Sequence, residues 1–366
     1  VVFGHEIVEV ATFRGSSDDG SGDRHLVDGR LVRDNVYGSL EEDAVRRDFT
    51  VNALYYDIAD FSVRDAVGGM ADLEQRVLRL IGEPELRYRE DPVRMLRAAR
   101  LAAKLDFEIA PDTAAPFATL GPLLGDAPPA RLFDESLKLF LSGYGLASFR
   151  ALERYGLLRH VFPPTAHALE DAATAPHFRH LLEQTFASTD ARVHENKPIT
   201  PAFLFAAMLW EPARRTAQAL IEAGAEPAAA WSQAGERVLR EQAQRVAIPR
   251  RFSIAIEEIW ALQLRFEQRT RKRVFRMLEH PRFRAAYDFL MLRADESAEV
   301  AELAQWWTQA QELGHEDLAE RLAAQPAQPA AEAAPTGKRK RPRRRRRRRS
   351  KAAAGETSAQ ATDDGR

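Results

Sequence analysis

The chain has 366 residues, with 53 lysines and arginines against 54 aspartates and glutamates, and it has no cysteine. The lack of cysteine excludes disulfides and cysteine-based zinc sites, and nothing in the composition points to an oxidising compartment. The longest apolar run, residues 201–210, is about half the length that a helix needs to cross a bilayer, which predicts a cytoplasmic protein without membrane contact.

Strand-like alternation is confined to the first eighty or so residues, and the pattern from Pro84 to about residue 320 is helical. The predicted strands cover residues 7–13, 49–58, 61–66 and 77–81. Residues 15–24, rich in Gly, Ser and Asp, predict a mobile loop. The predicted helices cover a segment opened by Pro128-Pro129 and stopped by Gly143, then residues 146–158, 177–186, 201–210, 237–245, 254–266, 271–278 and 282–293, and a last segment that carries Trp306 and Trp307. This order predicts an α+β chain.

Two motifs carry most of the functional information. Residues 46–56, Arg-Arg-Asp-Phe-Thr-Val-Asn-Ala-Leu-Tyr-Tyr, bring guanidiniums, a carboxylate and an amide into one short segment, which suits a polar, charged ligand. Residues 89–97 are helical by composition, and their spacing places Asp91 and Arg94 side by side with Arg97 one turn further on.

Adenosine triphosphate matches this set of side chains. Its triphosphate needs guanidiniums, its ribose hydroxyls need a carboxylate or amide, and its base edge needs one acceptor and one donor. Asp91 and Arg94 could supply that last pair, because a carboxylate accepts from the adenine amino group and a guanidinium donates to a ring nitrogen. From spacing alone, the open alternative is that Asp91 caps a helix opened by Pro92 and makes an ordinary surface ion pair with Arg94.

These two motifs, with residues 65–73, Asp-Ala-Val-Gly-Gly-Met-Ala-Asp-Leu, between them, resemble the bacterial poly(A) polymerase and CCA-adding nucleotidyltransferase family. The three motifs occur in the family's order and spacing, and the resemblance covers roughly residues 1–325. It implies that the first motif recognises ribose and assists catalysis. It also implies that the Gly-Gly segment is a hinge between head and neck, and that the Glu-Asp-x-x-Arg helix faces the base of the incoming nucleotide.

The activity implied by the resemblance is template-independent addition of adenylates from ATP to RNA 3′ ends. Two Mg²⁺ ions would activate the 3′ hydroxyl and stabilise the leaving pyrophosphate. The implied catalytic residues are Asp48 and Glu9, and Glu9 is also the candidate metal ligand. The implied nucleotide-binding residues are Arg46, Arg47, Asn52, Arg89, Glu90, Asp91, Arg94, Arg97 and Arg100.

The chain departs from the family at its start. The family carries two metal-binding carboxylates as Asp-x-Asp on a strand, and no such element precedes the first motif here. Because the chain begins at Val1, inside the implied head, we expect the chain as given to be incomplete and inactive. A further carboxylate stands beside the metal pair in the family, and Glu9 or Asp48 could take that place. A solvent-facing position on an edge strand is the alternative for Glu9.

Four regions are predicted in chain order. They are the remnant of a small mixed-sheet nucleotidyltransferase head over residues 1–83, a helical neck that binds base and RNA over 84–145, a helical RNA-binding body over 146–325, and a disordered basic tail over 326–366.

The formal net charge is -1, residues 338–351 contribute +12 and the last fifteen residues -2, so residues 1–337 carry -11. A run of like charges cannot bury apolar surface, which predicts disorder and a polyanionic partner, RNA before membrane. RNA-decay proteins are a further candidate partner of this tail.

A second basic run, residues 265–276, interleaves cationic and aromatic side chains, which suits phosphate contact and base stacking in single-stranded RNA. An ordinary basic helix surface is the alternative. The predicted RNA-binding residues are Arg269, Arg271, Lys272 and Arg273, with Arg343, Arg344 and Arg345 in the tail.

Two other functions remain open. The CCA-adding relatives share nearly the same motifs, but the segments 128–139 and 203–210 look like the polyadenylating branch, and an Arg-rich tail suits general RNA capture better than one tRNA shape. A non-catalytic RNA-binding fragment is the third reading, supported by the missing Asp-x-Asp pair.

Overall fold

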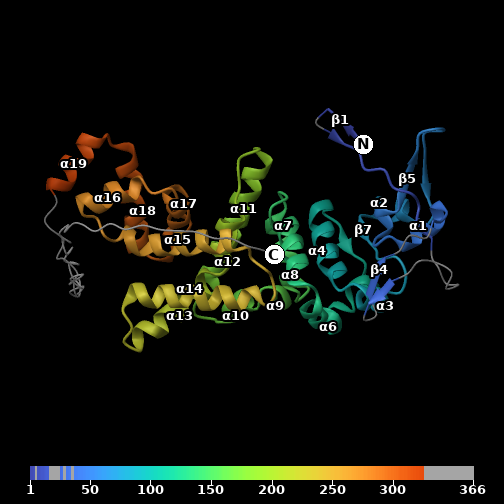
Figure 1. Cartoon of the computed structure of the whole chain (residues 1–366), viewed down its shortest axis with the longest axis horizontal. Coiled ribbons are helices and arrows are strands. Elements are labelled where there is room, and N and C mark those ends of the chain that lie inside the picture. Colours follow the sequence, from blue (N-terminus) through green and yellow to red (C-terminus); the bar gives the residue numbers. More distant parts are fainter. Residues whose placement is uncertain (5, 16–24, 28–29, 34–36, 325–366) are drawn as a thin grey trace, which may run out of the picture. The chain divides into compact units, whose positions relative to one another are not determined.

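The computed structural model describes residues 1–4, 6–15, 25–27, 30–33 and 37–324. Within these residues the chain is mostly helical, and its strands lie in the first 109 residues (Figure 1), which confirms the α+β prediction. The described strands pair as four two-stranded ladders, three antiparallel and one, β7–β8, parallel. The strands are β1 Val2–Phe3, β2 Glu6–Ile7, β3 His25–Val27, β4 Arg30–Arg33, β5 Leu54–Asp57, β6 Ser62–Asp65, β7 Val77–Leu78 and β8 Glu108–Ile109.

The helices follow the predicted order with shifted ends. The helix predicted over residues 271–278 has those bounds, and the helix opened by Pro128-Pro129 ends at Phe140. The α-helices are α1 Leu40–Arg46, α2 Gly69–Gln75, α3 Pro84–Glu90, α4 Val93–Leu105, α5 Pro111–Ala114, α6 Phe117–Leu120, α7 Pro129–Phe140, α8 Gly145–Arg154, α9 Leu158–Val161, α10 Pro163–Leu169, α11 Ala175–His194, α12 Pro201–Met208, α13 Trp210–Glu222, α14 Pro227–Ala243, α15 Arg250–Phe266, α16 Arg271–Leu278, α17 Phe283–Leu292, α18 Ala298–Glu312 and α19 His315–Ala324. Short 3₁₀ helices cover η1 Thr50–Asn52, η2 Gly121–Asp126 and η3 Ala294–Glu296.

The strand predictions are partly wrong. Residues 8–13 form no strand, because Val8 and Val10 face solvent at 46% and 77% exposure and no described strand pairs with them. The segment predicted as a strand over residues 49–58 begins with the η1 turn and becomes a strand at Leu54. Residues 62–65 are a strand as predicted, paired antiparallel with β5.

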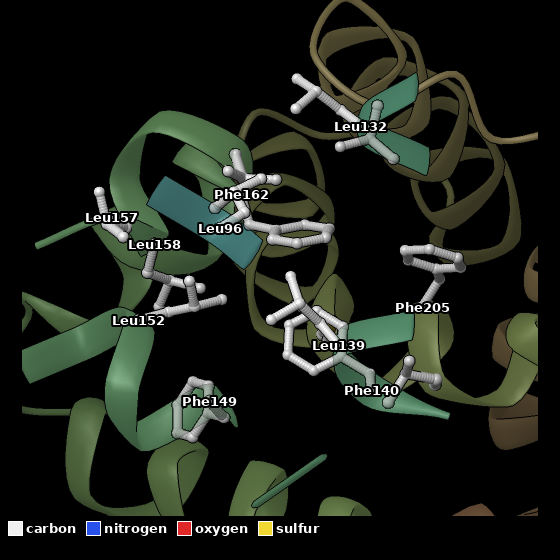
Figure 2. Close-up of a cluster of buried hydrophobic side chains, with 14 of the residues drawn as sticks. Leu96, Leu132, Leu139, Phe140, Phe149, Leu152, Leu157, Leu158, Phe162 and Phe205 are labelled. Atoms are coloured by element: carbon white, nitrogen blue, oxygen red, sulfur yellow. The ribbon is translucent and has the colours of Figure 1, made fainter. Parts of the chain in front are cut away.

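The main core joins α4 to the helices that follow it. Leu96 of α4 and Leu132, Leu139 and Phe140 of α7 belong to one buried cluster, which extends to Phe149, Leu152, Leu157, Leu158, Phe162 and Phe205 (Figure 2). Burial of one such leucine or phenylalanine contributes about 1.5–3 kcal/mol. This burial fixes the rotation of α4 about its axis, so Arg94 and Arg97 emerge together on the less buried face.

A second core lies in the C-terminal helices. It includes Trp307 and Phe266, with ring centroids 5.0 Å apart, and Trp307 Nε1 donates to the Phe266 carbonyl oxygen at 3.0 Å. Helix α12 and the start of α13 belong to the main core, and there the helix predicted over residues 201–210 is interrupted at Leu209. None of the helices in the described part of the chain is long and apolar enough to span a bilayer.

The Gly68-Gly69 pair begins α2 at a tight junction. Gly68 has a φ of 83°, in the left-handed region, and a Cβ at Gly69 would overlap the carbonyl oxygen of Thr50. The Asp65 carboxylate accepts hydrogen bonds from the N–H groups of four following residues, from Val67 at 3.1 Å to Met70 at 2.9 Å. This cap and the close approach fix α2 against the η1 turn that carries Asn52.

Of the predicted loop over residues 15–24 only Gly15 is among the described residues, and the predicted tail over residues 326–366 lies outside them. The predicted regional boundaries near residues 83, 145 and 325 all fall at or beside the ends of helices.

Candidate active site

The first motif begins at the C-terminal end of a capped helix, α1. Ser39 and Glu42 form a capping box at the start of α1. The acidic residues of its first turn and Arg46 in its last turn interact favourably with the helix dipole. The chain turns to extended backbone at Arg47 and then inserts Phe49, which is fully buried. This anchor leaves the flanking polar side chains of Asp48 and Asn52 on the surface of a cleft.

Asp48 is held by three groups. Its Oδ2 accepts from both Nε, at 2.8 Å, and Nη2 of Arg97, while its Oδ1 accepts from Asn52 Nδ2 at 3.0 Å and from the Phe49 N–H at 2.9 Å. Burial alone would raise the pKa of Asp48, but the hydrogen bond from Asn52 and the charge of Arg97 outweigh it and hold the pKa below its usual value. Asp48 is therefore an ionised acceptor at neutral pH.

Arg47 is oriented by a second carboxylate. Its Nε donates to Asp43 Oδ2 at 3.0 Å, and the Tyr55 hydroxyl donates to the same oxygen at 2.6 Å. The guanidinium also lies 5.5 Å from the centre of the Tyr55 ring. Arg47 is still about half exposed, so it is aimed at the cleft and open to a ligand.

The second motif spans a break between two helices. Helix α3 ends at Glu90 and α4 begins at Val93, so Asp91 is the C-cap of α3 and its Oδ1 accepts from the Val93 N–H at 3.2 Å. The sequence predicted that Asp91 and Arg94 lie on one helix, but in the structure only Arg94 lies inside a helix. Arg94 Nη1 donates to Glu90 Oε2 at 2.9 Å and to the Arg87 carbonyl oxygen at 2.7 Å.

Asp91 contacts a residue from further along the chain. Its Oδ2 accepts from Arg131 Nη2 of α7 at 2.6 Å, and this pair replaces the surface ion pair with Arg94 that spacing alone allowed. The carboxylate of Asp91 and the guanidinium of Arg94 still line the same cleft.

The cleft has a volume of about 410 Å³, and we call it the arginine cleft. It is lined by Arg46, Arg47, Asp48, Asn52, Asp91, Arg94 and Arg97. The two motifs, some forty residues apart in sequence, therefore meet in one polar pocket, as predicted. Four guanidiniums against two carboxylates leave the lining positive, which suits a polyphosphate, and the carboxylates and the amide suit hydroxyl and amino groups.

Three predicted residues lie elsewhere. Glu9 is exposed and belongs to no helix or strand, Arg89 is exposed and lies 3.8 Å from Glu85, and Arg100 donates from Nε to Glu135 Oε1 at 2.6 Å. None of the three lines the arginine cleft, and the predicted residue Glu90 contacts Arg94, which lines it, and Arg87.

Arg87 was missed by the sequence analysis. Its Nη2 donates to the carbonyl oxygens of Arg46 and Arg47, at 3.0 and 2.9 Å, and its Nη1 donates to Glu90 Oε2 at 2.8 Å. One guanidinium thus joins the end of α1 to α3 and sets the distance between the two motifs. Its neighbour Arg89 fits the basic pattern equally well, and only the rotation of α3 distinguishes the two.

The described residues do not fit a two-metal site by themselves. No group of three His, Asp or Glu side chains among them is placed to hold a metal ion, and the Asp48 carboxylate is already occupied by Arg97 and Asn52. Metal binding by Glu9 stays a prediction.

The predicted RNA-binding run lies at α16. Arg271, Lys272 and Arg273 are exposed on this helix, whereas the Arg269 guanidinium lies 5.4 Å from the centre of the Trp306 ring. Residues 343–345 lie outside the described residues.

The fold is shared with solved structures of tRNA-processing and CCA-adding enzymes. A tRNA-processing enzyme in its apo form has a TM-score of 0.52 and 20% identity, covering 78% of this chain and 75% of that chain. The Thermotoga maritima CCA-adding enzyme complexed with tRNA has a TM-score of 0.51 and 20% identity, covering 75% and 61%. These likenesses show the fold that the chain shares with those structures.

Sequence comparison identifies the branch. Residues 1–79 match the "Poly A polymerase head domain", residues 106–169 the "Probable RNA and SrmB- binding site of polymerase A", and residues 223–350 the "Polymerase A arginine-rich C-terminus". Poly(A) polymerase I of Escherichia coli O6:H1 is 50% identical over 84% of this chain and 67% of its own length, and that of Haemophilus influenzae is 45% identical over 84% and 69%. The chain belongs to the poly(A) polymerase I family.

The CCA-adding relatives are more distant. The CCA-adding enzyme of Streptococcus suis is 44% identical over 114 residues, which is 31% of this chain. The similarity to poly(A) polymerase I instead covers most of the chain, which confirms the preference for the polyadenylating branch over the CCA-adding alternative.

Proposed function

We propose that the arginine cleft binds the ATP from which this protein adds adenylates to RNA 3′ ends, with release of pyrophosphate. The observation that carries the proposal is that the two motifs converge on one pocket of about 410 Å³ whose lining combines four guanidiniums, two carboxylates and one amide. A triphosphate, a ribose and a base edge need these groups together.

We assign the roles from the contacts. Arg46 and Arg47 lie at the end of α1 and face the triphosphate, because their guanidiniums suit phosphate oxygens. Asp48, kept ionised by Arg97 and Asn52, accepts from a ribose hydroxyl. Its fixed orientation limits the reorganisation needed when the nucleotide binds.

Asp91 and Arg94 read the base edge in this proposal. Each is held by a partner outside the pair, Asp91 by Arg131 and Arg94 by Glu90, so both are oriented before the base arrives. The carboxylate accepts from the adenine amino group and the guanidinium donates to a ring nitrogen.

RNA is the second substrate in this proposal. We assign the regions over residues 84–145 and 146–325 to RNA as neck and body, and the tail over 326–366 to general RNA capture. The family match over residues 106–169 supports an RNA-binding role for the start of the helical part. A magnesium requirement, a cytoplasmic location and contact of the tail with RNA-decay proteins complete the proposal, each as an expectation from the family.

Primer extension by the full-length protein tests the proposal, with ATP and CTP supplied separately. Asp48→Ala should abolish transfer and leave RNA binding intact. Arg94→Ala should raise the KM for ATP and reduce the preference for ATP over CTP, because loss of one base-edge contact costs about 1–3 kcal/mol. The matched control is Arg89→Ala, which removes a guanidinium of the same helical region from outside the cleft.

Three results would count against it. Unchanged turnover in Asp48→Ala removes Asp48 from the active site, and equal losses with ATP and CTP in Arg94→Ala show that Arg94 contacts phosphate instead of base. Products that end after the order C, C, A would favour the CCA-adding alternative.

A further inference from the structure

A second basic pocket lies beside α16. It has a volume of about 240 Å³ and is lined by Arg265, Gln268, Arg273, Arg276, Met277 and His280, which we call the α16 pocket. Arg265 comes from the last turn of α15, Arg273 and Arg276 lie one turn apart on α16, and His280 follows that helix. Arg265, Gln268, Arg273 and Arg276 lie in the predicted basic run 265–276, and of these only Arg273 is among the individually predicted RNA-binding residues.

The arginines of the α16 pocket have no partners within the part of the chain that the structure describes. The side chains of Arg265, Arg273 and Arg276 make no hydrogen bond or ion pair there. Arginines at the start of the next helix, α17, do pair: Arg282 with Glu258 at 3.1 Å and Arg284 with Asp288 at 3.0 Å. The pocket lining contains no carboxylate, so its guanidiniums are uncompensated.

His280 adds a further donor. Its Nδ1 lies 3.1 Å from the Arg282 backbone nitrogen and accepts that N–H, so the ring proton is on Nε2. Three guanidiniums, an imidazole N–H and the Gln268 amide give a lining that mostly donates hydrogen bonds. The arginine cleft differs, because its two carboxylates also accept hydrogen bonds. A ligand of the α16 pocket must therefore be an anion rich in acceptors.

We propose that the α16 pocket binds a backbone phosphate of single-stranded RNA, and the proposal rests on the function proposed above. A polymer is favoured over a free phosphate because the positive surface continues past the pocket. Arg271 and Lys272 on the same helix are exposed and also lack a described partner. One small anion cannot contact all five cations, whereas successive phosphates along a strand can.

The test uses the full-length protein and a fluorescent oligoadenylate, with RNA affinity measured across a salt series. Arg273→Gln/Arg276→Gln should reduce the slope of log K against log salt by about 0.7 and weaken binding about five-fold at 0.1 M salt, the effect of one phosphate contact. Arg273→Lys/Arg276→Lys should retain the slope. The matched control, Arg282→Gln/Arg284→Gln, removes two arginines that already pair with carboxylates and should change affinity less than the pocket variant.

Two further measurements separate the alternatives. ATP affinity, measured without RNA, should be unchanged in the pocket variant, and the KM for primer should rise while kcat at saturating primer stays constant. If the protein binds RNA but fails to extend it, the proposed function is wrong while the pocket can still pass its salt test. Equal salt slopes in pocket and control variants would overturn the pocket proposal. The proposal would also be overturned if the pocket variant lost binding of inorganic phosphate or of an acidic peptide but kept the RNA affinity of the wild type.

Discussion

Removal of Arg97 should increase local opening of the first motif, residues 46–56, more than that of the other parts of the chain. Arg97→Met keeps the length of the side chain but leaves the Asp48 carboxylate, which is 11% exposed, without its charged partner. Loss of one partner of a buried pair costs about 3–5 kcal/mol. Asn52 and the Phe49 N–H still hold Asp48, and Arg97 itself is 35% exposed. We therefore expect a smaller destabilisation of the first motif, about 2 kcal/mol.

The location of the tryptophans decides the assay. All five lie at residue 210 or beyond, so intrinsic fluorescence reports on the C-terminal helices and would miss a change at Asp48. Amide hydrogen exchange of residues 46–56 measures local opening directly. A cost of about 2 kcal/mol corresponds to about 30-fold faster exchange in that segment, with little change in α15. Arg89→Met is the control, because Arg89 lies outside the cleft.

A double variant and a pH series complete this test. Asp48→Asn/Arg97→Met should exchange more slowly than Arg97→Met alone, because no buried charge remains unpaired. Since the folded-state pKa of Asp48 lies below its usual 3.8, the pair contributes stability above pH 3.8 and loses it as the pH falls further. The difference between wild type and Arg97→Met should shrink in that acidic range. Less than three-fold faster exchange at neutral pH would refute the reasoning.

Two more predictions follow from individual contacts. Arg87→Ala removes the donor to two carbonyl oxygens of the first motif and should weaken ATP binding about ten-fold in a direct titration, while Arg89→Ala changes it little; equal effects would contradict the joining role of Arg87. Asp65→Ala removes the acceptor of four N–H groups at the start of α2 and should cost about 1–2 kcal/mol, seen as faster hydrogen exchange over residues 67–75. Unchanged exchange in that peptide would show that Asp65 does not hold the helix.

The sequence predicts the helices better than the strands for a physical reason. Helix α16 has its predicted bounds because its apolar spacing is a local pattern. The strands are only two to four residues long, and each depends on a partner that local pattern does not identify. Residues 8–13 alternate as a strand does, yet Val10 is 77% exposed and no described strand pairs with the segment.

In the site, too, features that depend on local sequence were predicted and features that depend on individual long-range contacts were not. Both motifs were found from the sequence, and their meeting in one cleft was predicted. The partners Arg87 and Arg131 were not found, because Arg87 acts through backbone carbonyls 40 residues away and Arg131 through a contact 40 residues from Asp91. Nothing in local spacing marks such contacts. The break between α3 and α4 was missed because Asp91-Pro92 looks like the start of one helix.

The two basic sites differ in a way that suits the different demands of the two substrates. In the arginine cleft, Arg94 and Arg97 are each fixed by a carboxylate, so a nucleotide meets groups that are already oriented. In the α16 pocket, Arg273 and Arg276 have no described partner, so they can follow a phosphate that moves. An enzyme that adds one adenylate after another must hold each ATP in one geometry and let the RNA advance by one nucleotide. Phosphates repeat at every nucleotide, so a site that recognises phosphate alone is restored after each step.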